Sequence, residues 1–416
     1  MNNEKITLVS FLGKGVRDRQ TNAYRPARYQ LPGQPPWEKT MYIGQALAQQ
    51  IPNVSKFVIL GTPSSMWDVF ALDMAGEDAN DQQAMEALTE LEQAVREDRV
   101  TQAMLDAMAP TLSSRTGCEV CPRLIGYARD AQEQVEVLQV LSEQVNAGDT
   151  VVLDVTHGFR HLPMLALVAA RYLQHAREAQ TQAIYYGALE MTKPPPPAPD
   201  GITPVLNLHG MLQMLDWVDA LAVYQRTGDY GRMGHLMTHA GMAADKAKQW
   251  KQAAFFERNM AAELSVSKLD DAQKAMSELE NPLVKLFRPA LQQRMQWARE
   301  PNRALREQAL ADGYLKRGDY LRGVFYLYEC LLTTEVFQDP GSYAQLSAFE
   351  ARKNAAKTLK ERYWPHFGHL EYLRNTLAHG VRSDSTEVLQ ALKSEEQLLA
   401  FIENLRRALK QSMPTR

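Results

Sequence analysis

Near its carboxyl end the chain places an arginine and a histidine five positions apart, Arg374 and His379, directly before Gly380. These side-chain types suit cleavage of an RNA phosphodiester without a metal ion. A histidine can take the proton of a 2′-hydroxyl near neutral pH, and an arginine can bind the charge that develops at the phosphorus. Asn375, next to the arginine, either orients a phosphate or ribose or is a solvent-facing helix residue.

The segment that carries this pair has no helix breaker before Gly380, which is the expected C-cap. On an ideal helix, five residues separate two side chains by about 140°, so Arg374 and His379 do not share a face. One helix alone would make a poor site. The spacing therefore predicts a homodimer whose two copies supply both residue types to one phosphate; the alternative is an ordinary pair on a solvated helix.

The expected reaction is attack of the RNA 2′-hydroxyl on its own phosphate, which leaves a 2′,3′-cyclic phosphate. DNA lacks that hydroxyl and should not be cleaved. No cluster of Asp and Glu accompanies Arg374 and His379 in the sequence, so we predict no metal at this site. Cys118 and Cys121 form a Cys-x-x-Cys pair without a second pair of ligands at a suitable spacing, which favours plain thiols over a zinc site.

A second group of candidate residues follows three apolar runs that predict buried strands, at 5–12, 56–60 and 151–155. Small and polar residues fill the loops at their ends, over 10–15, 61–68 and 154–160. In open α/β sheets, ligands bind at the carboxyl edge of the strands, where backbone N–H groups at helix starts attract anions. Because Lys14, His157 and Arg160 add donors and charge, the loops predict a site for a phosphate-bearing ligand.

Helical patterns at 84–97 and 163–174 separate the strands, and a fourth strand is expected at 183–189. This order predicts an open, doubly wound, Rossmann-like α/β domain over 1–208, with an antiparallel α+β domain as the alternative. The segment from Lys193 to Gly201 contains four consecutive prolines, which predicts an extended connection. This connection either marks the domain boundary or forms a hairpin-like excursion before a last strand near 205–208.

From 209 to 416 we expect an all-helical domain. Two Gly-Asp-Tyr stretches, at 228–230 and 318–320, predict corners between helices. The expected helical regions are 211–224, 241–268, 283–299, 304–337, 348–363 and 394–411.

Composition limits the function classes. The chain has 416 residues, too many for one compact core, and its net charge of −3 argues against general nucleic-acid binding over the whole surface. The amino terminus lacks an apolar run long enough for a signal peptide, and no apolar stretch is long enough to span a bilayer. We expect a cytoplasmic protein without a membrane contact.

Three stretches resemble the CARF domain of CRISPR-associated proteins: Ser-Phe-Leu-Gly at 10–13, Gly-Thr-Pro-Ser-Ser-Met-Trp-Asp at 61–68 and Asp-Val-Thr-His-Gly-Phe-Arg at 154–160. The Arg-x4-His element of Arg374 and His379 resembles the signature of HEPN ribonuclease domains. The order of the two is similar to that of the ancillary ribonucleases of type III CRISPR systems. This resemblance covers essentially the whole chain.

The resemblance implies a Rossmann-like sensor that homodimerises and binds cyclic oligoadenylate across the twofold axis. Cyclic tetra-adenylate is the expected activator, because its symmetry matches the axis of a dimer. At Lys14 the chain departs from the family, where a threonine or another small polar residue is expected. The implied ligand-binding residues are Ser10, Leu12, Gly13, Lys14, Gly61, Thr62, Ser64, Ser65, Trp67, Thr156, His157, Gly158 and Arg160.

The expected function is therefore a metal-independent endoribonuclease of CRISPR antiviral defence, activated by cyclic oligoadenylate and without a cofactor. Its substrate is single-stranded RNA, cleaved with Arg374, Asn375 and His379 as catalytic residues, and duplex DNA is not a partner. Ligand binding would shift a dimer, or a higher oligomer, between loose and aligned catalytic pairs. Two alternatives stay open: a sensor that also degrades its cyclic ligand through His157 or Lys14, and a non-catalytic ligand-sensing regulator.

Overall fold

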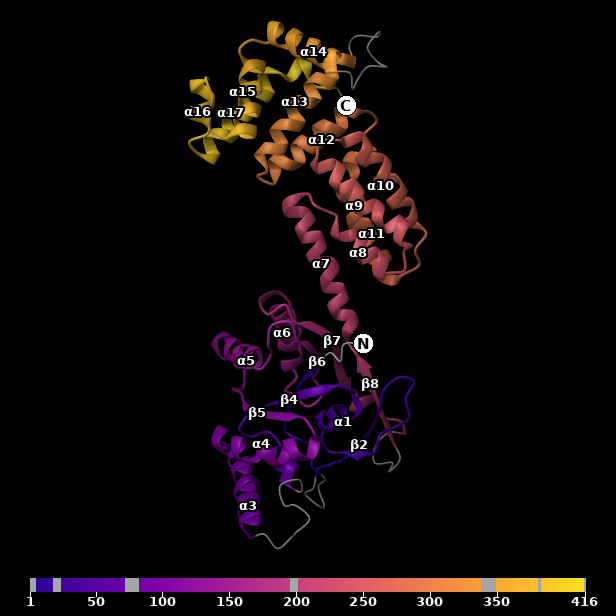
Figure 1. Cartoon of the computed structure of the whole chain (residues 1–416), viewed down its shortest axis with the longest axis vertical. Coiled ribbons are helices and arrows are strands. Elements are labelled where there is room, and N and C mark those ends of the chain that lie inside the picture. Colours follow the sequence, from indigo (N-terminus) through magenta and orange to yellow (C-terminus); the bar gives the residue numbers. More distant parts are fainter. Residues whose placement is uncertain are drawn as a thin grey trace. The chain divides into compact units, whose positions relative to one another are not determined.

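A computed structural model of the chain describes residues 5–17, 24–71, 82–194, 201–337, 349–380 and 383–414. It divides into two compact units, Met1–Leu212 and Gln213–Arg416. The first unit combines a sheet with helices, and the second is helical, as the sequence predicts (Figure 1).

The amino-terminal unit is built on one eight-stranded sheet. Its strands are β1 (Ile6–Leu12), β2 (Ala27–Gln30), β3 (Lys39–Thr40), β4 (Val54–Gly61), β5 (Glu119–Leu124), β6 (Thr150–Asp154), β7 (Gln180–Gly187) and β8 (Ile202–Asn207). They lie in the order β3-β2-β8-β7-β6-β1-β4-β5. The five strands from β7 to β5 are parallel, whereas β8 runs antiparallel to β7 and β3 antiparallel to β2. The parallel core confirms the open α/β fold, and the antiparallel pairs make the sheet mixed at one edge.

Helices cover both faces of this sheet, as a doubly wound fold requires. They are α1 (Ile43–Gln50), α3 (Gln82–Arg96), α4 (Gln102–Thr116), α5 (Ala131–Glu143) and α6 (Leu162–Ala176), with short 3-10 turns at Trp67–Phe70 and Leu189–Met191. In Figure 1, α5 and α6 lie on the face opposite to α1 and α4. Alternate residues of each strand supply the two faces; Leu8 of β1, for example, joins the core of α1 and α4.

The proline-rich connection confirms the excursion that the sequence allows. Lys193 and Ile202 pair in an antiparallel bridge, with both N–H groups donating to the opposite carbonyl oxygen at 3.0 and 2.9 Å. Strand β8 starts at Ile202 and then pairs with β7. Most of the proline run, 195–200, lies outside the described residues.

The carboxyl-terminal unit contains α7 (His209–Thr227), α8 (Arg232–His239), α9 (Ala244–Arg258), α10 (Ala262–Ser277), α11 (Pro282–Arg294), α12 (Arg303–Lys316), α13 (Tyr320–Phe337), α14 (Phe349–Arg362), α15 (His366–His379), α16 (Thr386–Ala391) and α17 (Glu395–Ala408). Gly228 and Gly318 have φ values of 77° and 78° at the two predicted corners, which confirms them. The region 241–268 holds two helices, because the chain turns at Met260, whose φ is 63°.

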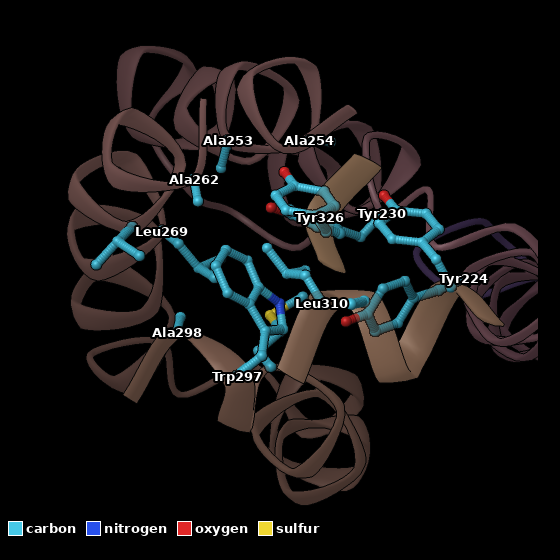
Figure 2. Packing of buried hydrophobic residues seen from close by; sticks show 14 of the residues in the cluster. Tyr224, Tyr230, Ala253, Ala254, Ala262, Leu269, Trp297, Ala298, Leu310 and Tyr326 are labelled. Carbon is cyan, nitrogen blue, oxygen red and sulfur yellow. The ribbon is translucent and has the colours of Figure 1, made fainter. Parts of the chain in front are cut away.

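A buried carboxyl group lies in the core of the helical unit. Glu257 of α9 is 1% exposed, and its Oε1 accepts a hydrogen bond from the hydroxyl of Tyr314 at 2.9 Å. The hydroxyl of Tyr326 donates to the main-chain oxygen of Glu257 at 2.5 Å. Burial raises the pKa of Glu257 to about 7. Figure 2 shows Tyr224, Tyr230 and Tyr326 beside Leu310 and Trp297 in this core.

Within the described residues, no helix combines the length and the apolar character that crossing a bilayer demands.

Candidate functional site

The three predicted ligand loops meet at one edge of the sheet. Strand β1 lies between β4 and β6 and is parallel to both, with Leu12 opposite Gly61 and Ser10 opposite Asp154. After β2 and β3 at the far edge, the chain adds β4 and β5 on one side of β1 and later adds β6 and β7 on the other side. This reversal is the topological switch point at which open α/β sheets bind ligands.

The first loop is bound tightly to the other two. A Cβ atom on Gly13 would lie 1.4 Å from the main-chain oxygen of His157, so only glycine allows this approach. The oxygen of Gly13 accepts a hydrogen bond from the N–H of Met66 at 2.9 Å. The hydroxyl of Ser65 donates to the oxygen of Leu12 at 2.5 Å. The loops after β1, β4 and β6 therefore form one surface.

A buried polar network supports this surface from below. Ser10 is 0% exposed, and its hydroxyl donates to Asp154 while it accepts from the hydroxyl of Tyr42 at 2.6 Å. The other oxygen of Asp154 accepts from the N–H and the hydroxyl of Thr156 at 3.0 and 2.6 Å. Burial raises the pKa of Asp154 to about 6, although these donors act in the opposite direction. Ser10 thus supports the loops from the interior.

The second loop is also held by its own polar side chains. The hydroxyl of Ser65 accepts from the N–H of Thr62 at 2.8 Å, and the indole N–H of Trp67 donates to the oxygen of Thr62 at 2.9 Å. All three residues are at most 1% exposed. A Cβ atom on Gly61 would lie 2.5 Å from the ring of Trp67. Their side chains shape the loop, and Ser64 at 6% exposure contacts the hydroxyl of Tyr127 at 3.1 Å.

His157 sits at the inner end of the third loop. Its Nε2 lies 3.4 Å from the hydroxyl of Tyr29 and 3.4 Å from the N–H of Ile43, and the ring of Tyr42 is 5.6 Å away. Burial lowers the pKa of His157 to about 4, so the imidazole is neutral at pH 7 and can accept from these donors. This arrangement gives the ring a positioning role in the loop.

The exposed charges of the three loops are Lys14 and Arg160. Neither forms an ion pair with another residue of the described ranges. Gly158, two positions before Arg160, is half-buried, and a Cβ there would lie 3.1 Å from Phe11. The two cations can therefore meet an anion, whereas most of the other predicted ligand residues are interior.

A row of rings that the sequence did not single out borders the same loops. Phe159 lies 6.0 Å from the stacked ring of His161 and 5.8 Å from the ring of Tyr127. The Nε2 of His161 lies 2.9 Å from the main-chain oxygen of Tyr127. Tyr127 follows β5, a strand that the sequence did not predict, so no signal pointed to it. Phe159 lies inside the Asp154–Arg160 stretch, so an aromatic residue within a predicted ligand loop could have pointed to it.

In the helical unit, Arg374 and His379 lie on one helix, α15, as the sequence predicts. The guanidinium carbon of Arg374 is 4.9 Å from the ring centre of Phe325 and 5.2 Å from that of Tyr328, both on α13. One guanidinium nitrogen donates to Oδ1 of Asn375 at 2.9 Å. The Nε of Arg374 is buried and has no hydrogen-bond partner among the described residues. Cation–π contacts therefore hold a guanidinium that carries no ion pair within those ranges.

His379 is the last residue of α15 and is exposed, and Gly380 with a φ of 80° is the C-cap, as predicted. Arg374 packs toward α13, while His379 faces solvent. The structure of one chain therefore does not bring the two side chains together, in agreement with the helix geometry.

The three cysteines are free thiols: Cys118 is half-buried, and Cys121 and Cys330 are buried. No group of three or more potential metal-binding side chains occurs in the described parts of the chain.

A comparison with known protein families covers most of the amino-terminal unit. Residues 7–190 match the model of the family described as "CRISPR system endoribonuclease Csx1, CARF domain". The matched residues contain all three ligand loops. The amino-terminal unit is a CARF domain.

A curated relative agrees with this assignment. The "CRISPR-associated protein MJ1674" of Methanocaldococcus jannaschii is 23% identical over 237 residues, which cover 52% of this chain and 36% of that protein. Both comparisons therefore show that the chain is similar to CARF-containing CRISPR-associated proteins. The chain matches little more than a third of the relative's length. The helical unit begins beyond the residues that the CARF model covers.

Proposed function

We propose that this protein is an endoribonuclease of type III CRISPR defence that a cyclic oligoadenylate switches on. The CARF domain is the sensor, and the helical unit is a HEPN-like nuclease that cleaves single-stranded RNA without a metal ion. The observation that carries the proposal is the CARF match over 7–190, followed by a helical unit in which one helix carries an exposed histidine and an arginine that forms no ion pair among the described residues.

On the sensor side, the ligand would lie over the loop surface. Lys14 and Arg160 would meet its phosphates, and Gly13, Gly61 and Gly158 would keep the three loops packed together beneath it, because a Cβ at each of them would press against neighbouring protein atoms. The rings of Phe159 and Tyr127 offer flat surfaces for adenine bases. The interior residues, such as Ser10, Thr62, Ser65 and Trp67, would fix the loop positions.

On the nuclease side, the chemistry follows from the two side chains of α15. His379 takes the proton of the 2′-hydroxyl, the freed 2′-oxygen attacks the adjacent phosphorus, and the bond from phosphorus to the 5′-oxygen breaks. A second histidine, from the partner copy, returns a proton to the 5′-oxygen. Arg374 binds the phosphorane oxygens, and Asn375 keeps one guanidinium nitrogen oriented.

The geometry of α15 gives a reason for a dimer. Arg374 packs on Phe325 and Tyr328 whereas His379 faces solvent, so one chain offers its two groups in different directions. Two copies around a twofold axis would place the arginine of one near the histidine of the other. Ligand binding in the sensor would then shift the equilibrium between loose and aligned pairs, which is an allosteric coupling between distinct sites.

The test is a fluorogenic RNA assay with cyclic tri-, tetra- and hexa-adenylate. We expect cleavage only with one ring size, cyclic tetra-adenylate, and a loss of about 100-fold or more for Arg374→Ala and for His379→Ala. The proposal would be overturned if the His379→Ala protein cleaved RNA as fast as the wild type, or if no cyclic oligoadenylate changed the cleavage rate.

The same protein preparations separate the alternatives. An Arg374→Ala, His379→Ala double variant that converts cyclic tetra-adenylate to linear products would reveal ligand degradation in the sensor. The neutral, half-buried ring of His157 does not favour this activity, because it faces Tyr29 and Ile43. A specific gel shift with duplex DNA would instead support a regulator.

A further inference from the structure

One tryptophan of this protein lies on the surface, and the other five are interior. The buried ones, Trp37, Trp67, Trp217, Trp250 and Trp297, are between 0% and 8% exposed, whereas Trp364 is 60% exposed. Exposure on this scale gives up a large hydrophobic contribution to stability. Trp364 is therefore a candidate for binding something outside the chain.

The ring of Trp364 is pressed against the backbone of α15. A Cβ atom on Gly368 would lie 2.5 Å from Cζ3 of the ring, so the glycine leaves the space that the indole fills. One surface of the ring is thus fixed by the helix, while much of the remainder is open to solvent. A rigid, half-covered ring is a suitable platform for a flat partner, because little side-chain entropy is lost on binding.

The platform shares a helix face with the proposed catalytic histidine. At about 100° per residue, Gly368, Tyr372, Asn375 and His379 fall within about 60° of one another around α15. Tyr372 and Asn375 are half-buried, and His379 is exposed. From Gly368 to His379 the helix rises about 16 Å. We call the surface formed by Trp364, Tyr372, Asn375 and His379 the α15 strip.

The charge around the α15 strip is nearly balanced, with a small positive excess. Residues 349–380 contain six Lys and Arg against three Asp and Glu, and Glu329 and Glu335 of α13 pair with Arg352 and Arg362, which leaves an excess of one positive charge. The exposed neighbours of Trp364 are polar, namely Glu361, Arg362 and His366. These polar neighbours differ from the contiguous apolar residues that a subunit interface buries.

We propose that Trp364 is a base-stacking platform for single-stranded RNA, and that the α15 strip guides the strand from this ring to His379. The proposal rests on the nuclease function proposed above and names how its substrate is held. Every base has a flat face, so stacking on Trp364 strengthens binding with little dependence on sequence.

The test measures RNA binding in a protein that does not cleave. In the full-length His379→Ala protein with saturating cyclic tetra-adenylate, fluorescein-labelled single-stranded RNA is titrated and followed by anisotropy. We expect Trp364→Ala to weaken the RNA Kd by about 5- to 100-fold and Trp364→Phe to retain most of the affinity. Phe255→Ala, which removes a ring that is 55% exposed on α9, is the matched control and should leave Kd unchanged.

Intrinsic fluorescence provides a second measurement. Because the other five tryptophans are buried, RNA should quench the emission of Trp364, and the quenching should disappear in Trp364→Phe. Unchanged Kd in Trp364→Ala, or no RNA binding by His379→Ala, would overturn the platform. The platform would also be overturned if Trp364→Ala lost RNA affinity and analytical sedimentation showed that this variant no longer forms the dimer. If the His379→Ala protein binds RNA through Trp364 but the wild-type protein never cleaves it, only the proposed nuclease function fails.

Discussion

Gly13 and the carbonyl of His157 approach so closely that a single methyl group at position 13 would overlap the oxygen, at 1.4 Å. The contact joins the ends of the neighbouring strands β1 and β6. At β1 the order in which the chain adds its strands reverses, because β4 and β5 lie on one side of it and β6 and β7 on the other. Because the two loops lie in direct contact, a ligand that displaces one of them would also press on the other.

Gly13→Ala should therefore disrupt the sensor surface. We expect a lower Tm, corresponding to a loss of about 1–3 kcal/mol from overpacking, and a weaker Kd for cyclic tetra-adenylate measured by calorimetry. Gly210→Ala is the control, because a Cβ there has no atom within 4 Å and alanine is favoured in a helix. Unchanged Tm and Kd in Gly13→Ala would contradict the close approach.

The aromatic contacts of Arg374 should matter for catalysis. Phe325→Leu removes a cation–π contact of about 0.5–2 kcal/mol, so we expect RNA cleavage to fall by roughly 2- to 30-fold at similar thermal stability. Arg374→Lys keeps the charge but loses the planar fork, and should lower cleavage much further. Phe255→Leu serves as the control. Full activity of Arg374→Lys would mean that only a point charge is needed.

The chemistry proposed for His379 makes no use of a metal. Excess EDTA should leave the rate of RNA cleavage unchanged, and a single 2′-deoxy substitution at the cleavage position should abolish cleavage there. Products are analysed by mass spectrometry for a terminal 2′,3′-cyclic phosphate. Cleavage of the 2′-deoxy substrate, or inhibition by EDTA that Mg²⁺ reverses, would require another mechanism.

The buried carboxyl group of Glu257 should make the helical unit sensitive to pH. Because burial raises its pKa from 4.5 to about 7, the folded state holds this proton more tightly than the unfolded chain does. The stability that this group contributes is therefore full below about pH 4 and is lost as the pH rises through 7. The loss is on the order of 1–3 kcal/mol.

Glu257→Gln removes this titration and retains an oxygen for the hydroxyl of Tyr314. Urea unfolding, followed by circular dichroism between about pH 5 and pH 8, should show a smaller loss of stability in the variant than in the wild type. Glu278→Gln, at an exposed glutamate, should behave like the wild type. Parallel pH profiles of the Glu257→Gln and wild-type proteins would contradict the assignment.

The central strands could be predicted from the sequence because continuous burial leaves a continuous apolar run. All seven residues of β1 are buried, and β4, β6 and β7 carry similar runs. Strand β5 was missed because Pro122 and Arg123 interrupt it, and β2 and β3 because short edge strands carry little pattern. The helices α9 and α10 were predicted as one because Met260 gives no turn signal.

The position of the ligand loops was predictable, since parallel strands end at one edge. The direction of each side chain was not. Ser10 carries a hydroxyl that suits a ligand, but its partner Asp154 lies 144 residues away in sequence, and the bond between them is internal. The hydroxyl of Ser65 is likewise used by the backbone of Leu12. Such long-range pairing leaves no local pattern.

The ligand loops have an interior part that holds their conformation and an exposed part that can be changed. The interior part is the hydrogen-bonded network of Ser10, Tyr42, Asp154 and Thr156. Anyone who wishes to redesign the sensor for another nucleotide ring can therefore leave these four positions untouched. A combinatorial library confined to Lys14, Phe159, Arg160 and His161 would vary the groups that reach solvent, at little risk to folding.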